Sequence, residues 1–203
     1  MRKQQQLILG LSGPPRSGKD TIAKFLCELL PGVAIRRMSA PLKHIALGFV
    51  PVEQRKLLEE SKDNPLNSIG TTYRDLQIGV WILGRDLMGE DWLGYQLLHS
   101  ISLCHARLII VPDFGRESEV AVLLHEGLLV KQLRISRPGT TFEGDSREDF
   151  KIPGPSNSRE VRNDGTLTDL RYIIEQLVPW LEERPVRSTE AGTHPDEEPL
   201  PAA

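Results

Sequence analysis

The feature that most constrains this chain is a glycine-rich segment near its N-terminus, which runs from Gly10 to Thr21 directly after the apolar residues Leu7–Leu9. Within it, Gly13, four intervening residues and then Gly18-Lys19 have the spacing of a phosphate-binding loop (P-loop), where a buried strand turns into a helix. Backbone N–H groups and the positive end of the helix attract phosphate oxygens there. A chance glycine-rich turn is the alternative, but strand, spacing, lysine and helix all agree, and we predict a bound nucleoside triphosphate.

Lys19 is expected to reach the outer phosphates of that nucleotide. In most phosphate-binding loops the residue after the lysine is Ser or Thr, but in this chain it is Asp20, which Thr21 follows. Asp20 could hold Mg²⁺ directly or through water; alternatively it is an acid favoured by the helix dipole, and Thr21 supplies the hydroxyl. The sequence leaves both readings open. The donor-binding residues predicted from this segment are Gly13, Pro14, Pro15, Arg16, Ser17, Gly18, Lys19, Asp20 and Thr21.

Length and composition indicate one globular domain with a substantial core, because 203 residues carry 39% hydrophobic and 26% charged side chains. The net charge is −3, and the tail 182–203 holds six acids against two arginines. The rest has no general basic character, which argues against duplex nucleic acid as a partner. We expect residues 1–181 to form the domain and the acidic, Pro-rich tail 182–203 to be disordered.

The two cysteines, Cys27 and Cys104, lie far apart and show no metal or redox spacing. We expect both to be buried free thiols, as suits a reducing cytoplasm. We also expect no secretion signal and no membrane span, because no apolar run is long enough.

Alternating apolar runs and helical patterns predict an α/β protein with a five-stranded, mostly parallel sheet flanked by helices, the P-loop NTPase fold. The expected strands are Gln6–Ser12, Val33–Met38, Arg107–Pro112, Val130–Ser136 and Arg159–Asn163. The expected helices include Gly18–Leu30, Glu117–Glu126 and Thr168–Leu181, the last with Thr166 or Thr168 as N-cap. A mainly helical insert (about 40–105) and a polar lid (about 139–158) complete the plan.

Asp113 directly follows the third expected strand, so it lies at the sheet edge that carries the phosphate loop. It could position a magnesium-bound water or accept a proton. The alternative is that it caps the helix beginning at Glu117. Arg116 and Glu119 could form an ion pair at the start of that helix.

Several arginines are candidate phosphate ligands, because phosphoryl transfer needs cations on donor and acceptor. Arg74 and Arg85 lie on nearly one face of a helix in the insert, ~16 Å apart if it is continuous. Arg36 and Arg37 end the second strand, and one of them is expected to point into the cleft. For Arg74 and Arg85, an exposed, solvated side chain is the alternative, and whichever of Arg36 and Arg37 does not enter the cleft is expected to meet solvent.

Two further arginines and one turn lie near the expected donor site. Arg137 follows the fourth strand, and Arg147 in the lid could close onto the triphosphate. The Asn163-Asp164-Gly165 turn follows the fifth strand and is expected to face the base of the nucleotide, although a plain turn explains it equally well.

Together these segments resemble the bacteriophage deoxynucleoside monophosphate kinases, within the nucleoside monophosphate kinase group. The matching stretches are Leu11–Phe25, Ser39–Ala46, Tyr73–Leu93, Val111-Pro112-Asp113 with Glu119, Arg137-Pro138-Gly139 and Asn163–Leu167. The Ser-Gly-Lys-Asp variant is also similar to that of animal phosphomevalonate kinases. Two stretches depart from the family: Gly115 stands where an arginine is usual, with Arg116 one place later, and 78–83 lacks the family's Leu-Gly-Thr-Glu.

The resemblance implies transfer of the γ-phosphoryl of ATP to a deoxynucleoside 5′-monophosphate, with Mg²⁺. It implies that Lys19 and the loop N–H groups hold the donor, that Arg16 or a lid arginine such as Arg147 covers the transferring group, and that Asp113 lies near the metal or the acceptor. The predicted metal residues are Asp20 and Asp113. It implies that Arg74 and Arg85 hold the acceptor phosphate. The full set of predicted substrate-binding residues is Arg36, Arg37, Lys43, Arg74 and Arg85.

Two other functions remain open from the sequence: a small-metabolite kinase of the phosphomevalonate type, and a P-loop switch ATPase. The expected partners are small-molecule nucleotides and a second copy of the chain as a homodimer, without nucleic acid or membrane. The expected place is the cytoplasm, that of the host if the protein is viral.

Overall fold

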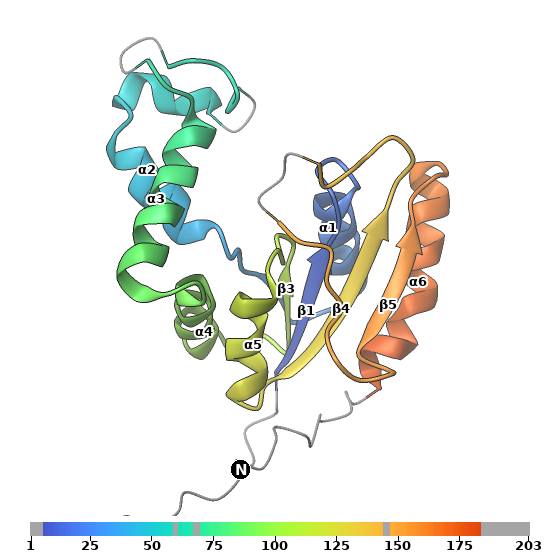
Figure 1. Ribbon diagram of the computed structural model, residues 1–203. Helices are drawn as coiled ribbons and strands as arrows, with labels where there is room; N and C mark the ends of the chain where they lie inside the picture. The colour runs from blue at the N-terminus through green and yellow to red at the C-terminus, as the bar shows by residue number, and fades with distance from the viewer. Residues whose placement is uncertain (1–5, 59–60, 67–69, 144–146, 184–203) are drawn as a thin grey trace, which may run out of the picture.

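The computed structural model describes residues 6–58, 61–66, 70–143 and 147–183. It places five strands in one sheet in the order β2-β3-β1-β4-β5 (Figure 1). The strands are β1 Leu7–Ser12, β2 Val33–Ile35, β3 Leu108–Val111, β4 Leu129–Ser136 and β5 Ser158–Arg162. All four neighbouring pairs are parallel. The expected five-stranded, mostly parallel α/β sheet is therefore confirmed, and β1 lies at its centre.

Strand β2 is shorter than the sequence predicts. It ends at Ile35 rather than Met38, although the N–H of Arg36 still donates to the carbonyl of Ile110 on β3. Beyond this point the backbone leaves the sheet, because the N–H groups of Met38 and Ser39 donate to the carboxylate of Asp113.

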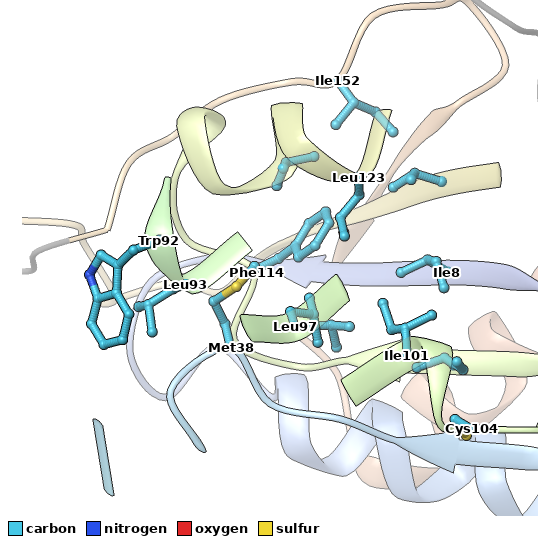
Figure 2. Close-up of a cluster of buried hydrophobic side chains, with 14 of the residues drawn as sticks. Ile8, Met38, Trp92, Leu93, Leu97, Ile101, Cys104, Phe114, Leu123 and Ile152 are labelled. Atoms are coloured by element: carbon cyan, nitrogen blue, oxygen red, sulfur yellow. The ribbon is translucent and has the colours of Figure 1, made fainter. Parts of the chain in front are cut away.

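Helices cover both faces of the sheet, as the alternation of strand side chains requires. Helices α1 (Lys19–Leu29) and α6 (Leu167–Glu182) pack on one face, over Leu9, Leu11 and Leu133. Helices α4 (Trp92–Ser102) and α5 (Glu117–His125) belong to the core of the other face. Figure 2 shows this second core, where Phe114 lies among side chains of α4, α5 and the sheet.

The insert is helical, as expected, and it stands beside the sheet in Figure 1. It comprises α2 (Ala40–Gly48), a 3-10 helix η1 (Val52–Leu57) and α3 (Tyr73–Met88). These elements have a small core of their own that includes Ala46, Val50 and Tyr73. The following helix α4 packs against α5, so the last part of the expected insert is anchored to the sheet.

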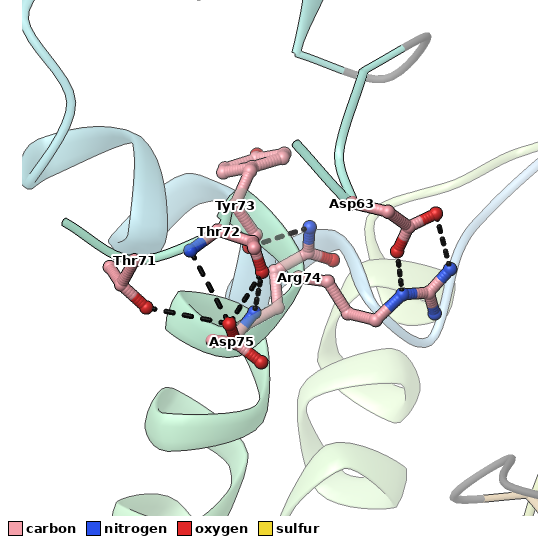
Figure 3. Close-up of polar contacts among 7 residues, drawn as sticks. Asp63, Thr71, Thr72, Tyr73, Arg74 and Asp75 are labelled. Atoms are coloured by element: carbon pink, nitrogen blue, oxygen red, sulfur yellow. Dashed lines mark hydrogen bonds and ion pairs between the residues drawn. The ribbon is translucent and has the colours of Figure 1, made fainter. Parts of the chain in front are cut away.

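Side-chain caps fix where two of the longer helices begin. Thr72 and Asp75 form a capping box at the start of α3, drawn in Figure 3, and Thr166 and Asp169 form one at α6. The N-cap expected at Thr166 or Thr168 is therefore Thr166. At the other end of α6, the buried Lys131 donates to the carbonyl oxygens of Trp180 and Glu183, which the helix leaves without an N–H partner.

One sequence expectation about the cysteines is wrong. Cys104 is buried, but Cys27 is exposed, because on α1 the buried stripe consists of Ile22, Ala23 and Leu26 and Cys27 points away from it. Within the described residues, no helix combines the length and hydropathy needed to cross a bilayer. Helix α6 includes Glu182, so the tail 182–203, which was expected to be disordered, begins within a helix. The rest of that expectation, for 184–203, lies outside the described residues.

A prediction concerns Gly10 on the central strand, since a Cβ at this position would overlap the ring of the fully buried Phe114. Gly10→Ala should lower the free energy of unfolding by about 1–3 kcal/mol, the usual range for an overpacked core. Denaturant unfolding measures this change. Gly48→Ala is the control, because a Cβ at Gly48 meets nothing within 4 Å. An equal effect of the two substitutions would contradict the close packing of β1 against Phe114.

Candidate active site

The predicted phosphate loop joins β1 to α1 at the carboxyl edge of the sheet. Gly13 and Gly18 have φ values of 149° and 104°, a backbone conformation that residues other than glycine rarely adopt. A Cβ on Gly13 would also overlap the carbonyl oxygen of Ile135, and one on Gly18 would overlap the side-chain nitrogen of Asn163. Glycine is therefore required at both ends of the loop by conformation and by space.

Lys19 lies inside this loop rather than in solvent, with 8% of its surface exposed. Its Nζ donates to the carbonyl oxygens of Gly13 and Pro14 at 2.7 and 2.6 Å and to Oγ of Ser17 at 3.3 Å. The ammonium group of Lys19 therefore already lies in the concavity of the loop. The oxygens of a bound phosphate would take the place of the loop oxygens as its hydrogen-bond partners. The geometry therefore agrees with the role predicted for Lys19.

The loop is tied to the ends of β4 and β5. The buried Asn163 side chain donates to the carbonyl of Ser17 at 2.8 Å, and its backbone N–H donates to the carbonyl of Ser136 at 2.8 Å. Arg137 donates to the carbonyl of Arg16, which is exposed and has a φ of 63°. The sequence-predicted donor residues Arg16, Arg137 and Asn163 thus meet at one place, and Asn163 also holds the loop in shape.

Asp20, in the first turn of α1, forms an ion pair with Arg37 at 2.6 Å through Oδ1. Both side chains are partly exposed, at 66% and 39%. Arg37 thus contacts the helix that follows the phosphate loop. The choice between Asp20 and Thr21 as the residue nearer the metal stays a prediction.

Asp113 follows β3 and binds the start of the insert. Its Oδ1 accepts from the N–H of Met38 at 2.9 Å, and its Oδ2 accepts from the N–H of Ser39 at 2.9 Å and from its hydroxyl at 2.6 Å. The alternative that Asp113 caps the α5 helix is therefore wrong, since the N-cap of α5 is Arg116 and the carboxylate binds the N-cap region of α2. Both carboxylate oxygens are engaged and the side chain is fixed in orientation.

Two arginines contact the same aromatic ring, that of Trp81. The guanidinium carbons of Arg116 and Arg85 lie 4.1 and 5.1 Å from the ring centroid of Trp81 on α3. Arg85 also pairs with Asp86 at 2.8 Å. Cation–π contacts of this kind are worth about 0.5–2 kcal/mol, so the ring holds two positive groups that would otherwise repel each other.

The segment that the sequence predicts as a lid supplies a third arginine to the same region. Arg147 packs so closely over Gly115 that a Cβ there would lie 2.7 Å from its Cγ. The next residue, Glu148, donates its N–H to the carbonyl of Gly115 at 2.8 Å and pairs with Arg116 at 3.4 Å. We call Arg85, Arg116 and Arg147 the arginine cluster, because α3, the β3–α5 turn and the lid bring them to one place.

Other predicted acceptor residues lie elsewhere in the insert. Arg74, at the opposite end of α3 from Arg85, forms an ion pair with Asp63 (Figure 3). That hydrogen bond lowers the pKa of Asp63. The carbonyl of Lys43 accepts from the hydroxyl of Tyr73. Arg36 lines a separate hollow at the sheet edge.

Glu119 is a buried carboxyl group beside the arginine cluster, only 4% exposed. Burial raises its pKa to about 8; the charge of Arg116 opposes this, and those of Asp113 and Glu148 add to it. The ion pair predicted between Arg116 and Glu119 is replaced by one between Arg116 and Glu148. At neutral pH, Glu119 is therefore mostly protonated, and it leaves the charge of Arg116 in place.

Two residues of the site were not predicted as functional from the sequence. For Trp81, its position four residues before Arg85 was a usable signal, because residues at this spacing meet on a helix. Ser39, which binds Asp113, gave no local signal at all.

The donor set suits Mg²⁺, a hard cation that prefers oxygen ligands and keeps several waters. Asp20 and Thr21 lie in the first turn of α1 and Asp113 follows β3, so the predicted donors are two carboxylates and a hydroxyl at the carboxyl edge of neighbouring strands. Among the described residues, no group of three or more His, Cys, Asp or Glu side chains could hold a metal by itself. A magnesium ion here would therefore depend on substrate phosphates for part of its coordination.

No protein-family model and no curated protein matches this sequence. Similar solved structures include TT1252 from Thermus thermophilus, with 19% identity, a TM-score of 0.48 and coverage of 88% of this chain and 100% of that one. The APS kinase CysC from Mycobacterium tuberculosis has 12% identity and a TM-score of 0.44, with coverage of 88% and 99%. Thymidylate kinase from Candida albicans has 15% identity and a TM-score of 0.43, with coverage of 87% and 92%.

A prediction concerns the pH dependence that Glu119 confers on stability. Because its pKa is about 8 in the folded state and 4.5 is the reference for an exposed glutamate, the folded protein binds one more proton between these values. Stability should therefore fall as pH rises from about 4.5 to about 8, by up to about 1.4 kcal/mol per pH unit. Glu119→Gln should remove this slope in denaturant unfolding measured across that range.

The control for this experiment is Glu117→Gln, the same chemical change on the exposed side of the same helical turn. It should keep the slope of the unmodified protein. A Glu119→Gln variant with that same slope would show that Glu119 is ionised in the folded state.

Proposed function

We propose that this protein transfers the γ-phosphoryl group of ATP to a (deoxy)nucleoside 5′-monophosphate, giving the diphosphate and ADP. The observation that carries the proposal is the pairing of two cationic sites at the carboxyl edge of neighbouring strands. The phosphate loop with Lys19 follows β1, and the arginine cluster surrounds the turn after β3. One suits the donor triphosphate, and the other suits an anionic acceptor.

The hydrogen bonds that Asp113 accepts favour a phosphate acceptor over a hydroxyl acceptor. A hydroxyl must lose a proton as it attacks, so a kinase for alcohols needs a carboxylate that can accept it. Both oxygens of Asp113 instead accept hydrogen bonds from Met38 and Ser39. A phosphate oxygen is already anionic and attacks without a base, and it is also the group that arginines bind best.

Each group has a role in positioning or in charge neutralisation. Lys19 and the loop N–H groups hold the donor, with Arg16, Arg137 and Asn163 beside them. The acceptor phosphate binds to Arg85 and Arg116, and Arg147 covers the transferring group when the lid closes over it. The new bond forms between phosphorus and the acceptor oxygen as the bond to the β–γ bridging oxygen breaks.

The remaining predicted residues contribute more distantly. Arg74 and Lys43 belong to the wall of the insert, and Gly165 belongs to the turn that carries Asn163. Mg²⁺ would be held near Asp20 and Asp113, either directly or through water, and when bound it supplies neutralisation of phosphate charge.

Two related functions would use the same loop. A small-metabolite kinase of the phosphomevalonate type also has a phosphate acceptor, and a switch ATPase has none. A panel of acceptors with ATP and Mg²⁺ in a coupled ADP assay separates the three. Turnover with deoxynucleoside monophosphates supports the proposal, turnover with the metabolite alone replaces it, and hydrolysis stimulated only by a protein partner indicates the switch.

A prediction concerns Lys19, the residue buried in the loop. Lys19→Ala should lower kcat by roughly 10²–10³-fold or more, the usual cost of removing a group that stabilises transition-state charge. Lys24→Ala removes the same charge from the exposed side of α1 and is the control. Circular dichroism should show that both variants fold. Near-normal turnover by Lys19→Ala would contradict the role of the loop as donor site.

A second prediction concerns Arg85. Since charge-assisted hydrogen bonds contribute about 1.5–3 kcal/mol, Arg85→Ala should raise the KM for the acceptor by roughly 10- to 100-fold. The KM for ATP should change little, because Arg85 lies in the cluster and not in the loop. Steady-state kinetics with each substrate varied in turn measures both constants. The exposed Arg107 supplies the control, Arg107→Ala; a rise only in the KM for ATP would place Arg85 on the donor side.

A further inference from the structure

We propose that a hollow at the β2 edge of the sheet binds a small phosphomonoester with an apolar body, such as a 5′-nucleotide, separately from the phosphate loop. The cavity has a volume of about 520 Å³, within the range of small-molecule sites. It lies between the end of β2, the start of α2 and the outward side of α4. No residue of the phosphate loop, the arginine cluster or Asp113 lines it.

The charged side chains that line the hollow favour an anionic ligand. Arg36 and Arg37 come from the end of β2 and His99 comes from α4, whereas no carboxylate lines the cavity. The side chain of Arg36 donates from Nη1 to the carbonyl of Ile35 at 3.0 Å, which uses one of its five N–H groups. Two guanidinium groups on consecutive residues provide the forked donors that fit phosphate oxygens.

The rest of the lining favours an organic phosphate over the free ion. Leu97, Leu103 and Pro41 contribute apolar surface, and Ser100 and Gln96 contribute hydrogen-bonding groups on the same helix. Burial of an apolar or aromatic body adds about 25 cal/mol for each Å² removed from water. The hollow should therefore bind a nucleoside monophosphate more tightly than inorganic phosphate.

Arg37 connects this hollow to the donor site. It lines the cavity, and it also pairs with Asp20, the residue after Lys19. A phosphate in the hollow competes with Asp20 for this guanidinium, so ligand binding alters the charge environment of the first turn of α1. By linkage, the hollow and the phosphate loop would influence each other's affinity equally.

The test is a titration of the ¹⁵N-labelled full chain with adenosine 5′-monophosphate, followed by amide resonances while saturating ADP and Mg²⁺ are present. The proposal expects saturable shifts of Gln96, Ser100 and Asp20 that ADP does not abolish. Inorganic phosphate should produce the same shifts with at least tenfold weaker affinity. The proposal would be overturned by shifts confined to the phosphate loop and the arginine cluster, or by the absence of shifts at millimolar adenosine 5′-monophosphate. Equal affinity for adenosine 5′-monophosphate and inorganic phosphate would show that the apolar lining contributes nothing to binding.

Variants separate this hollow from other anion sites. Ser100→Trp should fill the cavity and Arg36→Ala should remove a guanidinium, and either change should abolish the α4 shifts. Arg107→Ala, an exposed arginine outside the lining, should leave them intact. Retention of the shifts in both cavity variants would overturn the site. If Ser100→Trp does not fold, Arg36→Ala carries the test, and because the readout is binding, failure of the proposed phosphoryl transfer would not affect it.

Discussion

The hydrogen bonds of Asp113 join the two halves of the candidate site. Its carboxylate holds the N–H groups of Met38 and Ser39, so the chain that leaves β2 is fixed against the end of β3 before α2 begins. Charge-assisted hydrogen bonds contribute about 1.5–3 kcal/mol each, which is enough to set the direction in which the insert leaves the sheet. The position of α3, and with it Arg85 and Trp81, depends on this attachment and on the packing of α4 against α5.

The arginine cluster shows how like charges can be gathered before a ligand arrives. Arg85 and Arg116 both contact the ring of Trp81, and Asp86 and Glu148 each pair with one of them. These carboxylates are more than half exposed, so their ion pairs are weak and easily exchanged for a phosphate. The site therefore has its cations positioned in advance, and a dianionic ligand gains their attraction without a large cost of ordering side chains.

Local patterns were enough to predict the strands, the glycine-rich turn and α1, because each depends on residues close together in the sequence. Parallel topology then brought Asn163 to the same edge as that turn, since the carboxyl ends of β1 and β5 share it. The turn at Asn163 was expected to face the base of the nucleotide, and its hydrogen bond to Ser17 was not predicted. Contacts between distant segments were beyond such reasoning. The bond between Ser39 and Asp113 and the stacking of Arg116 on Trp81 depend on how the insert returns to the sheet. Cys27 was expected to be buried because it lies within a helix, but a helix also has an exposed face, and Cys27 lies on it.

Glu119 explains how a buried acid can serve a cationic site. If it were ionised, its charge would cancel that of Arg116, and the cluster would attract an anion less strongly. Burial on α5, beside Asp113 and Glu148, makes ionisation costly and keeps the proton bound up to about pH 8. The same apolar packing that stabilises the sheet face thus maintains the positive potential next to it. Fold and electrostatics are linked here through one proton, because loosening of the core around Glu119 would lower its pKa and weaken the cluster.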